Sequence, residues 1–142
     1  MSTPEEVQQR CFIDTNIWLY AFIETNDGHK RAIAKGIIQK SDVVVSTQVI
    51  NEVCVNMIKK AALSETAIQS LIGAFYYKYT VANLDKATLL KASELRSQYS
   101  LSYWDSLIVA TALSADCVVL YSEDMQNGLQ IAQRLRIANP FR

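Results

Sequence analysis

The stretch CFIDTNIWLYAF occupies residues 11–22 and joins a short β-rich run to a longer apolar one. The run 11–13 fits a buried strand, and Asp14 stands where that strand stops. Ligands of parallel α/β sheets collect at the carboxyl ends of the strands, so the Asp14 carboxylate is predicted to point into a site. Asp14, Thr15 and Asn16 are also favoured at helix N-caps, which leaves a purely structural role as the alternative.

Further β-rich runs alternate with helical patterns along the rest of the chain. The predicted strands are residues 11–13, 43–46, 79–82, 117–121 and, on a weaker pattern, 135–138. Apolar residues recur at helical spacing within 47–58, 64–75, 85–99 and 104–113. This alternation is typical of the α/β class, in which helices cover a parallel sheet.

Length and composition bound the domain organisation. The chain has 142 residues, of which 50% are hydrophobic and 20% charged. This size predicts one globular domain over residues 1–142, with residues 1–10 as a polar N-terminal extension. No apolar run approaches the roughly 20 residues that cross a bilayer, and the polar start lacks a hydrophobic signal region. We therefore expect a cytoplasmic protein with no membrane partner.

Residue usage argues against several kinds of active site. Cys11, Cys54 and Cys117 are far apart and lie among apolar neighbours, which favours buried thiols. The one histidine, His29, lies in a polar stretch and is predicted to be on the surface. Thiol catalysis, Ser-His-Asp catalysis and zinc binding all depend on histidine or paired cysteines, so we do not expect them. Carboxylates are the reactive groups that remain.

The charges of the chain balance. Fourteen Lys and Arg residues face fourteen Asp and Glu residues, which gives a net charge of zero. The sequence therefore has no global positive field to drive nonspecific nucleic-acid binding, which argues against an RNA-coating module. A nuclease remains compatible because bound metal ions invert the potential where carboxylates converge. The basic residues considered for phosphate contacts are Lys30, Arg31, Lys35, Lys59 and Lys60.

Glu52 follows the second predicted strand, on the helix that begins near Thr47. At 100° per residue, it lies off the centre of the apolar stripe formed by Val49, Val53 and Met57. Taken alone, this position favours a solvated helix face. Its place among the other acids makes Glu52 a second candidate for the site.

Asp105 lies in the segment 104–113, which is apolar almost all round and predicts a buried helix. A carboxylate there is costly to bury without a partner or a metal ion. Ser102 and Asp105 also have the spacing of a capping box, which is the structural alternative. Both roles can hold together, because a first-turn acid is stabilised by the helix dipole while its other oxygen faces a cation.

Asp124 closes the series, because the strand predicted over 117–121 runs out into Ser122, Glu123 and Asp124. A turn, or the cap of a helix through 129–134, is the structural alternative. Strand ends in one parallel sheet can bring all four acids to one edge. Such a cluster is usually kept because a hard cation neutralises it, and oxygen-only donors point to Mg²⁺ or Mn²⁺.

Four short motifs, in this order, resemble those of PIN domains. They are FIDTN at 12–16, Glu52 after the second strand, YWDSLI at 103–108, and YSEDM at 121–125 followed by Gly128. Their residues and spacing most resemble those of the VapC toxins of VapBC toxin–antitoxin pairs, and the resemblance extends from residue 11 to residue 141. It implies a three-layer PIN-like α/β sandwich, in which helices flank a central, mostly parallel sheet of about five strands.

The resemblance also implies an activity. Such proteins are Mg²⁺- or Mn²⁺-dependent endoribonucleases, often homodimers, that cut RNA and are inhibited by an antitoxin encoded beside them. Carried over by position, the acidic site that holds the metal is Asp14, Glu52, Asp105 and Asp124. The residues that would orient these acids are Thr15, Asn16 and Ser122, whereas Glu123 would be turned away.

Two other functions stay open. A phosphatase would use Asp14 as its nucleophile, but such enzymes usually carry a second acid two residues on, where this chain has Asn16. A noncatalytic adaptor would bind Mg²⁺ or a protein partner through the same fold. The presence of all four acids favours the nuclease over the adaptor.

Overall fold

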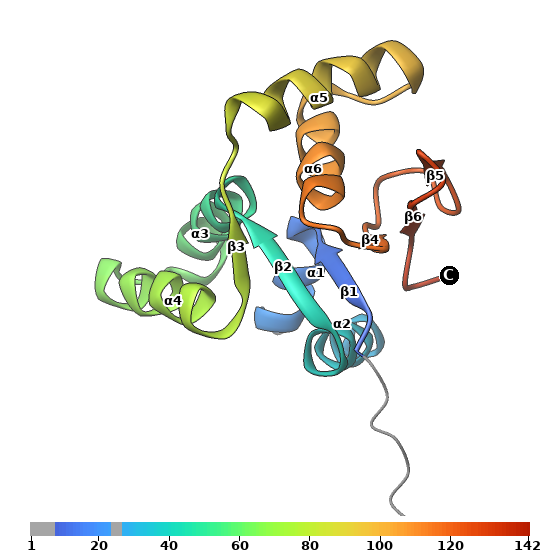
Figure 1. Cartoon of the computed structure of the whole chain (residues 1–142). Coiled ribbons are helices and arrows are strands. Elements are labelled where there is room, and N and C mark those ends of the chain that lie inside the picture. Colours follow the sequence, from blue (N-terminus) through green and yellow to red (C-terminus); the bar gives the residue numbers. More distant parts are fainter. Residues whose placement is uncertain (1–7, 24–26) are drawn as a thin grey trace, which may run out of the picture.

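The computed structural model describes residues 8–23 and 27–142. Within these residues, six strands form one sheet that six helices flank (Figure 1). The strands are β1 (Arg10–Ile13), β2 (Asp42–Ser46), β3 (Thr80–Ala82), β4 (Val119–Tyr121), β5 (Gln130–Ile131) and β6 (Leu135–Ala138). The helices are α1 (Thr15–Phe22), α2 (Gly28–Lys40), α3 (Thr47–Ala61), α4 (Glu65–Lys78), α5 (Lys86–Gln98) and α6 (Tyr103–Ser114).

The sheet has the strand order β3-β2-β1-β4-β6-β5, and all neighbours pair in parallel except β5 and β6. The chain moves outward from β1 to β3 through α1–α4 and then returns through α5 and α6 to the other side of β1. Right-handed crossovers in opposite directions place these two sets of helices on opposite faces (Figure 1). The reversal between β1 and β4 is a topological switch point, where a crevice opens at the carboxyl ends of the strands.

The predicted α/β class and the PIN-like sandwich are confirmed, with one strand more than the five expected. The extra strand, β5, comes from the segment 129–134, so the helix considered there is wrong. Ala132 and Gln133 have φ values of 52° and 57°, and the Arg134 amide donates to the Ile131 carbonyl at 3.1 Å. Three residues, 132–134, join the paired Ile131 and Leu135, and positive φ values in such a short connection are typical of a hairpin, so pairing with β6 outweighs the local helical spacing.

The central strands are buried on both faces. Cys11, Phe12 and Ile13 in β1 are all 0% exposed, which is expected of a parallel strand covered by helices on both sides. Trp18 of α1 is also fully buried and packs edge-on against Phe75 at a centroid distance of 5.0 Å. Its indole Nε1 donates to the Ile13 carbonyl at 3.0 Å. The chain is therefore fixed immediately before and after Asp14.

The boundaries of several elements differ from the predicted ones. β4 begins two residues later than expected, and α4 continues to Lys78 beyond the predicted end at residue 75. Residues 1–7 of the predicted N-terminal extension lie outside the described residues, while Arg10 belongs to β1 and pairs with Asp42 at 3.5 Å. The three cysteines are free and buried, and His29 is exposed, as predicted. Among the described helices, none has the length and apolar character needed to cross a membrane.

Candidate active site

Asp14 lies at the carboxyl end of β1, next to the end of β4. Its amide donates to the Tyr121 carbonyl at 3.0 Å, and its side chain is only 8% exposed. One carboxylate oxygen accepts from the Thr15 amide at 2.8 Å, which makes Asp14 the N-cap of α1. The other oxygen accepts from the Ser122 hydroxyl at 2.9 Å. The capping role is therefore real, and it leaves the carboxylate between the two strands of the switch point.

The surroundings of Asp14 disfavour its charged form. Burial raises the pKa of its carboxyl group from 3.8 to about 6. Hydrogen bonds from Ser122 and Thr15 lower this pKa in part, while the negative charges of Asp105 and Glu52 raise it. Asp14 is therefore the acid on which desolvation and repulsion act most strongly.

Glu52 is carried by α3, which begins directly after β2 with Ser46 as its N-cap. Its Oε2 accepts a hydrogen bond of 2.6 Å from the Thr15 hydroxyl. The side chain is half-buried and lines the same hollow as Asp14, so it does not lie on a freely solvated helix face. Thr15 thus links α1 to α3 and sets the direction of the second acid.

Asp105 lies in the first turn of α6, where its amide donates to the Ser102 hydroxyl at 3.1 Å. The capping interpretation is confirmed for Ser102. The carboxyl group of Asp105 is only partly buried, although the following residues of α6 are buried. Burial raises its pKa, a hydrogen bond with Ser102 lowers it, and the charges of Asp124 and Glu52 raise it. The sequence predicted that burying the Asp105 carboxylate would be costly without a partner or a metal ion, and the structure leaves it half-buried, whereas Asp14 is only 8% exposed.

Asp124 lies in the loop after β4 and is exposed. Its Oδ2 accepts a hydrogen bond from the Asn16 side-chain amide, which connects this loop to the first turn of α1. Ser122 is fully buried beneath it and donates to Asp14, while its oxygen accepts from the Met125 amide at 3.3 Å. Asn16 and Ser122 therefore hold the loop against the end of β1.

The four predicted acids line one hollow of about 250 Å³. Its lining residues are Asp14, Thr15, Asn16, Glu52, Asn56, Trp104, Asp105, Ile108 and Asp124. Ser122 lies behind Asp14 and does not line it. Three lining residues were not predicted as site residues. Helical spacing from Glu52 could have indicated Asn56, which donates to the Glu52 carbonyl at 2.8 Å, and adjacency to Asp105 could have indicated Trp104.

The donors in this hollow suit a hydrated hard cation. Across residues 8–23 and 27–142, no three His, Cys, Asp or Glu side chains converge closely enough for a ready-made cage. Mg²⁺ does not need one, since it usually keeps several waters and uses one or two carboxylates. Among the same residues, no lysine or arginine forms an ion pair with any of the four acids. The negative charges in the hollow are therefore not neutralised by a basic side chain of the described residues.

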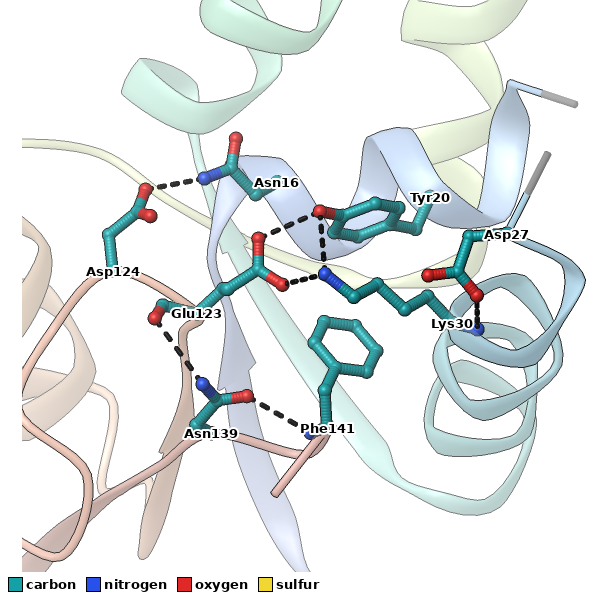
Figure 2. A network of polar contacts seen from close by, with 8 residues as sticks. All are labelled: Asn16, Tyr20, Asp27, Lys30, Glu123, Asp124, Asn139 and Phe141. Carbon is teal, nitrogen blue, oxygen red and sulfur yellow. Dashed lines mark hydrogen bonds and ion pairs between the residues drawn. The ribbon is translucent and has the colours of Figure 1, made fainter. Parts of the chain in front are cut away.

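Glu123 is directed away from the hollow. Figure 2 shows Glu123 pointing toward Tyr20 and Lys30, whereas Asp124 points toward Asn16. The Lys30 ammonium lies 2.6 Å from Glu123, and the Tyr20 hydroxyl donates to Glu123 at 2.7 Å. Lys30 was considered for phosphate contacts, but its charge is used within the protein.

These contacts change the titration of both charged groups. The hydrogen bond with Glu123, followed by that with Tyr20, raises the pKa of Lys30 to about 12. Burial raises the pKa of Glu123, but hydrogen bonds from Lys30 and Tyr20 and the charge of Lys30 outweigh it, so the pKa is lowered overall. The pair therefore stays ionised over the physiological range.

The C-terminal segment completes this network (Figure 2). The Lys30 ammonium lies 5.2 Å from the ring centre of Phe141, and the Asn139 side chain donates to the Glu123 carbonyl at 3.4 Å. The Phe141 amide donates to the Asn139 side chain at 3.0 Å. We refer to Tyr20, Lys30, Glu123, Asn139 and Phe141 as the Glu123 network. It fixes the loop that carries Asp124 from the side opposite the hollow.

Solved structures of other proteins have a similar fold. Similar folds occur in a toxin–antitoxin complex from Klebsiella pneumoniae, at 20% identity and a TM-score of 0.70 over 92% of this chain and 97% of that chain. VapC20 from Mycobacterium tuberculosis, a Sarcin-Ricin loop cleaving toxin, has 16% identity and a TM-score of 0.61 over 78% and 86%. VapBC2 from Rickettsia felis, bound to a promoter DNA fragment, has 17% identity and a TM-score of 0.63 over 92% and 100%.

At these identities the likeness to solved structures concerns the fold alone. No curated protein sequence matches this chain. The sequence model of the PIN domain matches residues 11–127, a range that contains all four acids of the hollow. This chain therefore belongs to the PIN domain family.

Proposed function

We propose that this protein is a metal-dependent endoribonuclease that hydrolyses RNA phosphodiester bonds. One observation carries the proposal. Four carboxylates from four separate segments line one hollow at the switch point of the sheet, and no described basic side chain pairs with them. Crowded acids of this kind are stable when a divalent cation neutralises them, and a phosphate then has a positive centre to bind.

The residues have distinct parts in this reaction. Asp14, Asp105 and Asp124 offer carboxylate oxygens for Mg²⁺ or Mn²⁺, and Glu52 adds a fourth acid. When bound, the metal supplies Lewis-acid polarisation of the phosphate and lowers the pKa of bound water. Thr15 and Ser122 hold Glu52 and Asp14 in fixed directions by hydrogen bonds of 2.6 and 2.9 Å. An acid that is not engaged in binding accepts the proton of the attacking water.

We further propose that this nuclease is the toxin of a type II toxin–antitoxin pair and forms a homodimer. Support comes from the solved structures with the same fold, which include a Sarcin-Ricin loop cleaving toxin and a toxin–antitoxin complex. An acidic hollow without an internal cation also suits inhibition from outside. An arginine of the antitoxin can form two parallel hydrogen bonds with such carboxylates and compete with the metal.

The nuclease proposal is tested with purified full-length protein and a labelled single-stranded RNA. We expect internal cleavage with Mg²⁺ or Mn²⁺ and none with excess chelator. The products distinguish the alternatives, since a phosphatase would remove terminal phosphate without internal cuts, and an adaptor would leave the RNA intact with every metal. Cleavage that persists in chelator would falsify the proposal.

The toxin proposal has its own tests. Induced expression should arrest growth for the wild type but not for Asp124→Asn, and co-expression of the gene product encoded beside it should restore growth. Replacing the antitoxin arginine that enters the hollow with methionine should release cleavage in a purified mixture. Growth arrest by Asp124→Asn equal to that of the wild type contradicts the toxin proposal. Light scattering of the purified protein measures its mass in solution, and the mass of a single chain would contradict the homodimer.

A further inference from the structure

Trp104 stands out among the residues of the hollow. Its side chain is 62% exposed, although it lines the same space as Asp14 and Asp105. Single exposed apolar side chains are common on protein surfaces and usually need no explanation. Trp104 differs in its position, because a ligand that fills the acidic hollow also contacts the indole.

Neighbouring side chains hold the base of Trp104 in place. The ring of Tyr103 packs edge-on against the indole at 5.3 Å, and the Arg96 guanidinium lies 4.4 Å above the Tyr103 ring. Arg96 also donates to the Ser106 hydroxyl at 2.6 Å, which ties α5 to the first turns of α6. The indole therefore stands on an ordered surface rather than on a free loop.

We propose that Trp104 stacks against an unpaired base of single-stranded RNA beside the phosphate that the acidic hollow receives. This inference rests on the proposed nuclease function and adds a base-binding subsite to it. Aromatic faces stack on any base, and such stacking typically contributes about 1–3 kcal/mol per base. Bases inside a duplex are already stacked on each other, so the subsite selects loops and single strands.

The overall charge supports this assignment. Proteins that bind RNA through many phosphate contacts carry an excess of basic residues, whereas this chain has fourteen of each sign. Two further hollows share a residue with the acidic one: the hollow that shares Asn16 contains Lys60, and the hollow that shares Asp124 contains Arg142. With few cations available, stacking on Trp104 supplies a larger share of the affinity. The salt dependence of binding should therefore be weak, because the slope is about −0.7 for each phosphate contacted and few phosphates are contacted.

The two tryptophans make the subsite directly measurable. Trp18 is 0% exposed, so a change of fluorescence caused by a ligand at the surface reports on Trp104. The full-length protein is titrated with a 12-nucleotide single-stranded RNA of mixed sequence. Ca²⁺ replaces Mg²⁺ to limit cleavage, and gels of the same samples report any that occurs. We expect the single strand to quench the emission and the matching duplex to leave it unchanged. Trp104→Phe should show no quenching.

Affinity and kinetics give the second readout. Trp104→Ala should raise the Kd for the single strand by roughly 5- to 150-fold, which corresponds to the stacking contribution. Trp104→Phe, which keeps an aromatic face, should raise it less. Tyr77→Ala is the matched control, because Tyr77 is 90% exposed on α4 and does not line the hollow. In cleavage assays the Trp104→Ala variant should show a raised KM with a nearly unchanged kcat.

Three outcomes would overturn the inference. The first is an unchanged Kd in Trp104→Ala, and the second is equal quenching by duplex and single strand. The third is that acrylamide, which quenches exposed tryptophans, does not reach Trp104 in the free protein because a second copy covers it. The proposed function fails separately. RNA that quenches Trp104 but is not cut with Mg²⁺ or Mn²⁺ defeats only the nuclease, and metal-dependent cleavage with an unchanged KM in Trp104→Ala defeats only the subsite.

Discussion

Glu123 and Asp124 are adjacent in the chain and carry the same charge, but their surroundings differ. Glu123 faces the Lys30 ammonium at 2.6 Å and accepts a hydrogen bond from the Tyr20 hydroxyl. Among residues 8–23 and 27–142, the one hydrogen bond to the Asp124 carboxylate comes from the neutral amide of Asn16, and Asp124 lies with three other acids around one hollow. The first charge is neutralised by the protein itself and serves to hold the loop. The second has no basic partner among the described residues, which is the basis for proposing a metal ion there.

The largest expected effect is on the acids of the hollow. Asp14→Asn, Asp105→Asn and Asp124→Asn should each lower RNA cleavage by about 100-fold or more, because a carboxylate that binds metal or moves a proton is lost. Asp116→Asn is the matched control, since Asp116 is exposed, pairs with Arg134 at 3.0 Å and does not line the hollow. Initial rates at saturating Mg²⁺ and circular dichroism check activity and folding. Wild-type rates in all three variants would remove the site assignment.

The next effect concerns the stability of metal-free protein. The pKa of Asp14 is about 6 when folded and 3.8 in its ordinary range, so the folded protein holds this proton more tightly. The stabilisation that this bound proton gives the folded state is fully present below the ordinary pKa of 3.8. It is lost as the pH rises through the folded pKa of about 6. Chelated wild type should therefore lose about 2 kcal/mol of unfolding free energy between pH 4 and pH 7.

Asp14→Asn separates this effect from general acid sensitivity. Asparagine keeps an acceptor for the Thr15 amide and removes the charge, so the chelated variant should lose less stability over the same pH interval and melt higher at pH 7. Excess Mg²⁺ should stabilise the wild type more than the variant. Urea unfolding at pH 4, 5.5 and 7 measures the difference. If the unfolding free energies of the two proteins change equally with pH, burial and the neighbouring acids do not raise the pKa of Asp14.

The Glu123 network should have a smaller, indirect effect. Lys30→Met leaves Glu123 without its cation, which loosens the loop that positions Asp124. We expect roughly a 10-fold loss of activity together with weaker Mg²⁺ affinity. Arg134→Met breaks a surface ion pair and should change neither. Melting temperature as a function of Mg²⁺ concentration distinguishes positioning from simple destabilisation. A Lys30→Met protein that melts lower but binds Mg²⁺ normally would show that the network is only structural.

The smallest expected effect is at Thr15, whose hydroxyl donates to Glu52 at 2.6 Å. Thr15→Val preserves shape and the backbone amide that Asp14 caps, but removes this hydrogen bond. A loss of about 1 kcal/mol, or about 5-fold in activity, is expected. Thr15→Ser should restore most of it, because serine keeps the hydroxyl. If valine and serine behave alike, the direction of Glu52 does not depend on Thr15.

Much of this architecture could be predicted from the sequence because its signals are local. Alternating strand and helix patterns predicted the sheet, and strand ends located Asp14 and Asp124. The hairpin at residues 129–134 could not be found in this way. Its turn uses Ala132 and Gln133 at positive φ rather than the expected glycine or asparagine, and only pairing with β6 specifies it.

The exposure of individual side chains was harder to predict. An aspartate in an apolar helix indicated a buried Asp105, but the first turn of α6 opens into the hollow and leaves this residue half-buried, whereas Asp14 at the end of β1 is buried against Ser122. Trp104 was counted in the segment 104–113, which was predicted to be a buried helix, but it is exposed. Periodicity assigns a residue to a helix face, whereas the packing of other elements decides whether that face is covered.

The parallel pairing of β1 with β4 has a consequence for protein synthesis. Asn16 and Asp124 meet in the folded molecule although 108 positions separate them. A nascent chain that ends before β4 carries three of the acids but has no neighbour for that side of β1 and no loop to bring the fourth. On the proposed nuclease function, the chain should therefore be unable to cut RNA near the ribosome until most of the domain has emerged. Stalled chains ending at residue 118 should leave added RNA intact, whereas released full-length chains from the same translation mixture should cut it.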